Sequence, residues 1–102
     1  MNLYQGNTYN LKVRVLSHDK EPLNINEIEK VEFTFGSLVK KYPNDGIVFN
    51  EDFFIIPLSQ EETFSLEGVV KYQIRVKFID GTVTNTKPTN ARISDSLSKE
   101  VL

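Results

Sequence analysis

The stretch GVVKYQIRVKFI, residues 68–79, decides the fold class of this chain. Apolar and polar side chains alternate along it, the period-two pattern of a strand with one buried and one solvent-exposed face. The apolar members are Val70, Tyr72, Ile74, Val76 and Phe78. Asp80 and Gly81 follow at once, and both residue types tolerate positive φ. The sequence therefore predicts a long strand that reverses in a two-residue hairpin loop and returns through residues 82–84.

Shorter segments with strand-like patterns lie on both sides of this hairpin. The further predicted strands are 9–15, 30–35, 38–42, 47–49, 53–57 and 91–93. The run FFII at 53–56 contains no polar residue, so we expect it to be buried on both faces. Polar residues and Pro88 follow Val83, which predicts that the return strand lies at a sheet edge.

Two short helical segments are predicted from capping patterns. Asn26 followed by Glu29 has the spacing of an N-cap with a partner that reaches back, which predicts one turn over 25–30. Ser59 and Glu62 match the capping box Ser-x-x-Glu, which predicts a short helix over 60–64. Residues 94–102 are expected to form either a last helical turn or a loose, flexible tail.

About seven short strands with regular turn signals are typical of an antiparallel sandwich or a small barrel. We expect an all-β, immunoglobulin-like β-sandwich with one or two short helical turns. A small barrel of the oligonucleotide-binding type is the alternative, because it also has a long central hairpin and a capping helix. The length of 102 residues predicts a single domain spanning 1–102.

Composition narrows the functional classes. The chain is 39% hydrophobic and 11% aromatic, which is too apolar for intrinsic disorder. Its net charge of −2 argues against general nucleic-acid binding, although residues 67–102 carry six Lys/Arg against four Asp/Glu. The lack of cysteine excludes disulfides and thiolate metal sites. No apolar run predicts a membrane span, and the first residues do not resemble a signal peptide.

Residues able to carry catalysis are few. His18 is the only histidine, and Ser17-His18-Asp19 are chain neighbours that cannot adopt the spatial geometry of a hydrolase triad. The acidic pairs Glu51-Asp52 and Glu61-Glu62 are better explained as a turn and a helix cap than as a glycosidase pair. We therefore expect no enzymatic activity, no metal and no cofactor.

A basic stripe is the main candidate for a contact site. Lys71, Arg75 and Lys77 alternate with the apolar residues of the long strand, so they share its solvent face. Lys87 and Arg92 could extend the stripe, and an acidic surface of a neighbouring subunit would complement it. The apolar end of the tail, Val101-Leu102, is the second candidate contact.

Several short turn and packing segments follow one another in a particular order along most of the chain. They are GNT at 6–8, the strand 11–15, PLNI at 22–25, VEFTF at 31–35, PLSQEET at 57–63, VKYQ at 70–73, DGT at 80–82 and DSL at 95–97. This order resembles small β-rich proteins of phages and prophages of Gram-positive bacteria, in particular the N-terminal domain of baseplate upper proteins. Those proteins continue into a helical linker, so a small virion or tail accessory protein is the closer match.

The resemblance implies a non-enzymatic tail or baseplate component that acts through protein contacts, in the virion or in the host cytoplasm during assembly. Its expected partners are other phage structural proteins or further copies of this chain, with no nucleic acid and no membrane. A carbohydrate- or surface-binding module is the first alternative, with Tyr4, Tyr42 and Phe53 as candidate aromatic contacts. A single-stranded nucleic-acid-binding barrel is the second alternative.

Overall fold

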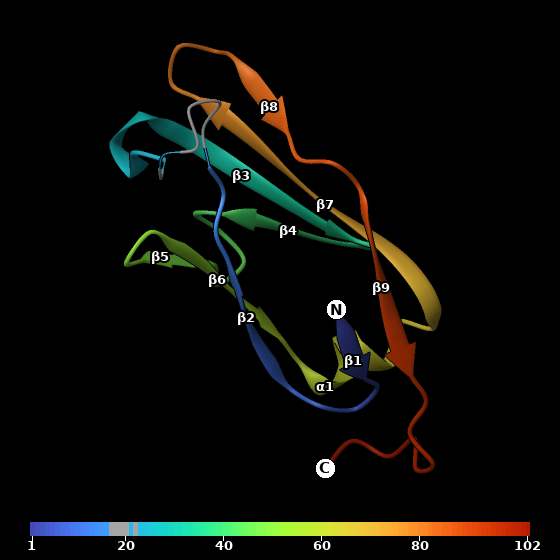
Figure 1. Cartoon of the computed structure of the whole chain (residues 1–102). Coiled ribbons are helices and arrows are strands. Elements are labelled where there is room, and N and C mark those ends of the chain that lie inside the picture. The colour runs from blue at the N-terminus through green and yellow to red at the C-terminus, as the bar shows by residue number, and fades with distance from the viewer. Residues whose placement is uncertain (17–20, 22) are drawn as a thin grey trace.

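The computed structural model describes residues 1–16, 21 and 23–102, and these form two β-sheets with two short helical elements (Figure 1). The predicted all-β class with short helical turns is confirmed. The helical elements are η1 (Ile25–Glu27) and α1 (Gln60–Phe64). The strands are β1 (Asn2–Tyr4), β2 (Tyr9–Val13), β3 (Ile28–Phe35), β4 (Leu38–Tyr42), β5 (Val48–Asn50), β6 (Phe53–Leu58), β7 (Gly68–Phe78), β8 (Val83–Asn85) and β9 (Thr89–Ser94).

The large sheet is built around β7, the strand predicted from the alternating stretch. Its order is β1-β9-β7-β3-β4, and β8 adds to β7 as a sixth strand. One edge of β7 is shared, because β9 pairs with its first half and β8 with residues 75–77 near its end. This confirms the edge position predicted for the return strand. Every pair in this sheet is antiparallel except β1 with β9, which is parallel.

The small sheet has the order β2-β6-β5 and is antiparallel throughout. Its inward side chains and those of the large sheet form one hydrophobic cluster. The T-shaped contact of Tyr42 on β4 with Phe54 on β6, 5.6 Å between ring centroids, joins the two sheets directly. The largest fully buried apolar side chains are Phe33, Phe35, Phe54, Ile56, Leu58, Leu66 and Val76. The strands are thus divided between two layers around a shared core, as in a sandwich.

Local hydrogen bonds test the predicted caps and turns. The capping box of α1 is confirmed, since Ser59 Oγ accepts from Glu62 N–H at 3.1 Å and Glu62 Oε1 accepts from Ser59 N–H at 2.9 Å. The predicted cap of the first helical turn is wrong, because Asn24, not Asn26, is the N-cap of η1. Asn24 Oδ1 accepts a hydrogen bond from the Asn26 N–H, so the cap lies two residues earlier than predicted and the turn ends at Glu27.

The hairpin between β7 and β8 differs from the prediction by one residue. Phe78 N–H donates to Thr82 C=O and Gly81 N–H donates to Phe78 C=O, both at 2.9 Å. The loop therefore has three residues, 79–81, and only Gly81 among them has positive φ, at 94°. A turn followed by one left-handed glycine is the usual three-residue hairpin, so the two-residue prediction was wrong.

Two other predictions are corrected. The run FFII is not buried on both faces, because Phe54 and Ile56 are buried whereas Phe53 and Ile55 are only partly covered. Strand β1 was not predicted at all, since three residues carry no usable periodicity and are fixed by pairing with β9.

Strand β4 is an edge strand with an inward-pointing lysine. Lys40 Nζ lies 2.8 Å from Glu62 Oε1 of α1 and donates a hydrogen bond to the Pro57 carbonyl of β6. Partial burial raises the pKa of Glu62, but the bonds from Lys40 and Ser59 outweigh it, so that pKa lies below its usual value. The next residue, Lys41, donates its backbone N–H to Asp45 Oδ2 at 2.9 Å.

Among the described residues no helix is long and apolar enough to cross a membrane.

Candidate interaction surface

The outer face of the large sheet gathers basic side chains from four neighbouring strands. The inward positions of β7 belong to the core, so the residues between them face outward. Strand register then places outward residues of β3, β4 and β9 beside them. We call the resulting surface the basic face; its cations are Lys30, Lys41, Lys71, Arg75, Lys77 and Arg92.

The sequence identified only part of this surface. Lys71, Arg75 and Lys77 lie on one face of β7 as expected, and Arg92 on β9 extends that face. Lys87 lies between β8 and β9, outside the strands. Lys30 and Lys41 were missed, because their place on the same face as Lys71, Arg75 and Lys77 depends on the pairing of β3 with β7 and of β4 with β3. Alternation within β3 and β4 was the only available signal.

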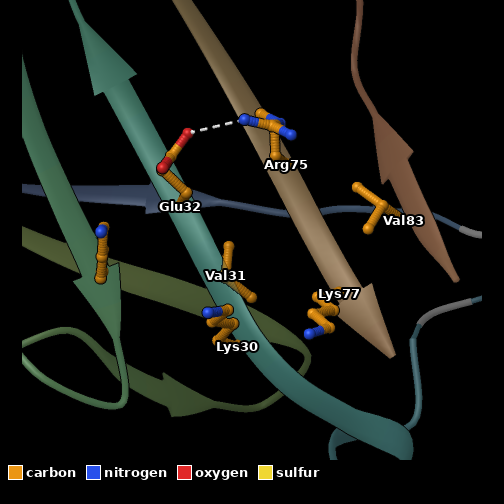
Figure 2. Close-up of a pocket in the computed structure, with 7 residues that line it drawn as sticks. Lys30, Val31, Glu32, Arg75, Lys77 and Val83 are labelled. Carbon is orange, nitrogen blue, oxygen red and sulfur yellow. Dashed lines mark hydrogen bonds and ion pairs between the residues drawn. The ribbon is translucent and has the colours of Figure 1, made fainter. Parts of the chain in front are cut away.

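A hollow of the basic face lies where β3, β7 and β8 meet (Figure 2). It is a groove of about 210 Å³ lined by Lys30, Val31, Glu32, Lys41, Arg75, Lys77 and Val83. Figure 2 shows Glu32 and Arg75 reaching toward each other from adjacent strands, with 3.5 Å between Oε1 and an Arg75 guanidinium nitrogen. The groove therefore carries four cations and one carboxylate, a strongly positive balance for so small a space.

Charge pairing within this surface is incomplete. Lys77 Nζ lies 3.4 Å from Glu29 Oε2, and Lys30 stands directly opposite Lys77 in the β3–β7 register. Like charges in directly opposed positions destabilise a sheet. In the described part of the chain Lys30, Lys41 and Lys71 have no carboxylate within ion-pair distance. These exposed ammonium groups are free to pair with an external anion.

The C-terminal tail lies apart from the basic face. Residues 95–102 contain no helix, so the predicted helical turn is not formed. Ser96 N–H and Lys99 Nζ bond the Gln5 side chain, and Leu102 N–H donates to Gln60 Oε1 at 2.8 Å. Val101 and Leu102 are 53% and 102% exposed, and their role as a contact stays a prediction.

The aromatic residues proposed for ligand binding do not form one surface. Tyr4 is 57% exposed on β1, at one end of the large sheet. Tyr42 turns inward against Phe54, and Phe53 lies on the outer face of the small sheet. The rings on β3, β4 and β7 all belong to the core, so no described aromatic residue of these strands lies on the basic face.

Three residues of the acidic pairs Glu51-Asp52 and Glu61-Glu62 form part of a turn or a helix cap. Glu62 caps α1 and pairs with Lys40, as its predicted role as a cap required. Glu51 and Asp52 form the β5–β6 turn, with φ of 49° and 69°. Among residues 1–16, 21 and 23–102 no cluster of His, Cys, Asp and Glu is arranged to hold a metal ion. Ser17, His18 and Asp19, considered above for catalysis, lie outside the described residues.

Comparison with protein-family models, curated proteins and solved structures gave no match. The phage resemblance and the immunoglobulin-like subtype therefore stay predictions.

Proposed function

We propose that this protein is a non-enzymatic structural component that acts through protein–protein contacts, with the basic face as a docking surface for an acidic protein partner. The observation that carries the proposal is the convergence of cations from β3, β4, β7 and β9 on one sheet face. Following the phage resemblance, the proposed setting is a tail or baseplate, with other phage structural proteins as partners.

The electrostatics of the surface favour a protein partner. The whole chain has a net charge of −2, so the basic face is a local positive field on a weakly acidic molecule. Such a patch raises association rates and fixes orientation toward a partner of opposite charge. Single-stranded nucleic acid would instead require aromatic rings beside the cations for base stacking, and the described rings of these strands face the core.

Titration with a defined acidic probe tests this proposal. The probe is a twelve-residue peptide of alternating Glu and Thr, and a Gln-Thr peptide of the same length is the control. We expect backbone amide NMR shifts of residues on β3 and β7 with the acidic peptide only, with affinity falling as salt rises. Exposed charges are screened within about 8 Å at physiological ionic strength, so the salt effect is intrinsic to such a surface.

Variants locate the binding on the protein. The triple change Lys41→Gln, Lys71→Gln, Arg75→Gln should weaken peptide binding by about tenfold, since each exposed ion pair contributes about 0.2–1 kcal/mol. The control is the double variant Lys12→Gln, Lys87→Gln, which removes two positive charges outside the basic face. Equal loss in both proteins would argue for non-specific charge attraction. Tighter binding of single-stranded DNA than of the acidic peptide would favour the nucleic-acid alternative.

The phage setting is tested separately from the binding chemistry. Genes for tail or baseplate proteins next to the gene of this chain, and recovery of the chain in purified particles, are the expected results. A genomic setting among genes for carbohydrate-active enzymes would favour the binding-module alternative.

A further inference from the structure

The outer face of the small sheet breaks the pattern of a solvent-exposed sheet. Antiparallel sheets with one wet face normally carry polar residues there. On this face β6 instead presents Phe53, Ile55 and Pro57, and β5 adds Val48, which is 52% exposed. The register sets Ile55 directly beside Val48, so these side chains are contiguous. We call this surface the apolar stripe; its members are Val48, Phe53, Ile55 and Pro57.

Charges of both signs border the apolar stripe. From β2 and the residue after it, Lys12 Nζ lies 5.3 Å and the Arg14 guanidinium carbon 5.9 Å from the centre of the Phe53 ring. Neither cation has a carboxylate within ion-pair distance in the described part of the chain. Beyond β5, the exposed turn residues Glu51 and Asp52 supply negative charge at the same end of the sheet.

We infer that the apolar stripe binds a second copy of this chain in a two-fold symmetric dimer. In the order β2-β6-β5, Lys12 and Arg14 lie on the β2 side of β6. The acidic turn of Glu51 and Asp52 lies on the β5 side, where it closes the β5–β6 hairpin. A two-fold axis parallel to the strands sets β2 of one copy opposite β5 of its partner. Arg14 of each copy then faces the partner's Glu51, while the apolar stripes cover each other. One surface thus supplies both halves of a complementary interface, as two-fold symmetry requires.

The composition of the surface fits this role. An aromatic ring flanked by arginine, with aliphatic neighbours and a charged rim, is typical of the energetically important centre of protein interfaces. The small net charge of −2 offers little repulsion between copies. The inference is independent of the proposed function, because the basic face lies on the other sheet and is not used.

The first experiment measures molar mass in solution over a concentration series from about 10 μM to 1 mM, a range that covers weak dimers. The double variant Val48→Thr, Ile55→Thr keeps β-branched residues in the strands while removing apolar surface. The matched control is Val39→Thr, Val69→Thr, which makes the same kind of change at positions 46% and 61% exposed on the large sheet. We expect dimerisation of the first variant to be at least about tenfold weaker and that of the control to be unchanged.

The second experiment uses charge exchange. Arg14→Glu alone and Glu51→Arg alone should each give monomers, because every cross-contact then joins like charges. An equimolar mixture should form a heterodimer, since both contacts are again between opposite charges. Circular dichroism of each variant establishes that it is folded. The inference would be overturned by a wild-type protein that stays monomeric to 1 mM. It would also be overturned by a dimer whose dissociation constant is unchanged by both the Thr substitutions and the charge exchange.

Discussion

The outer faces of the large and the small sheet are both formed by alternate residues of their strands, but one face is charged and the other is apolar. On β7 the outward positions from Lys71 to Lys77 are polar, and only Val69 at the start of the strand is an exposed apolar residue among the outward positions of β7. On β6 the outward positions are Phe53, Ile55 and Pro57, and the face is apolar. An apolar run on a strand with no second layer over it marks a surface that gains from being covered. The missing alternation in FFII therefore points to contacts between molecules, whereas the alternation in β7 indicates a sheet face that is exposed to solvent.

The largest expected effect compares two neighbouring phenylalanines of β6. Phe54→Ala removes a fully buried ring and should lower the free energy of unfolding by about 3–5 kcal/mol. Phe53→Ala removes a partly exposed ring and should cost the monomer about 1 kcal/mol. Urea unfolding at low micromolar protein concentration measures both. Equal costs would mean that the outer face of β6 is covered within the monomer, and the contrast between the two faces would fail.

A smaller effect concerns the ion pair between Lys40 of β4 and Glu62 of α1. Glu62→Gln weakens the contact with Lys40 of β4 and half of the capping box, so we expect a loss of about 1 kcal/mol at pH 7. Because the pKa of Glu62 in the folded protein is below its ordinary value of 4.5, this stabilisation is present above pH 4.5 and disappears as pH falls through the lowered pKa.

The pH dependence of unfolding by urea checks this assignment. The wild-type and Glu62→Gln curves should be separated at pH 7 and should converge in acid. Glu61→Gln is the matched control, because Glu61 is the exposed neighbour with no side-chain bond to Lys40. A constant separation at all pH values would show that the carboxylate is not the stabilising group.

The smallest effect is a change in the free energy of unfolding, and we expect Lys→Gln substitutions on the two faces to change it in opposite directions. Lys12→Gln removes a cation from the Phe53 ring and should cost about 0.5 kcal/mol. Lys30→Gln relieves the repulsion with Lys77 directly opposite and should gain about 0.3 kcal/mol at low salt. Thermal unfolding at low and high salt resolves the two. Loss of stability in both variants would contradict the described crowding of charge on the basic face.

Local signals in the sequence predicted local structure well. The Ser59–Glu62 capping box and the alternation of β7 both act within a few residues, and both are confirmed. The hairpin at Gly81 was placed correctly but given one residue too few, since Asp-Gly fits both loop lengths. Strand β1 escaped because three residues gain their strand conformation only from pairing with β9.

The candidate site was predictable only in part for the same physical reason. The basic side chains of β7 share a face by the geometry of one strand, which the sequence reveals directly. Lys30 and Lys41 reach that face through pairing of β3 with β7 and with β4, and register is a property of the folded sheet. Tyr42 was proposed as an exposed ligand contact, but its ring packs inward against Phe54, and this direction is set by tertiary packing that the sequence does not reveal.

The outer edge of β4 limits how this protein can assemble. Lys40 points inward from the edge, and a carboxylate of Asp45 already occupies the outward N–H of Lys41. A strand added at this edge would have to displace that carboxylate, and an inward-pointing charge on an edge strand is a recognised defence against such addition. We therefore expect β4 to resist growth of the sheet by strand addition. Copies that meet through the same face about a two-fold axis instead form a closed dimer.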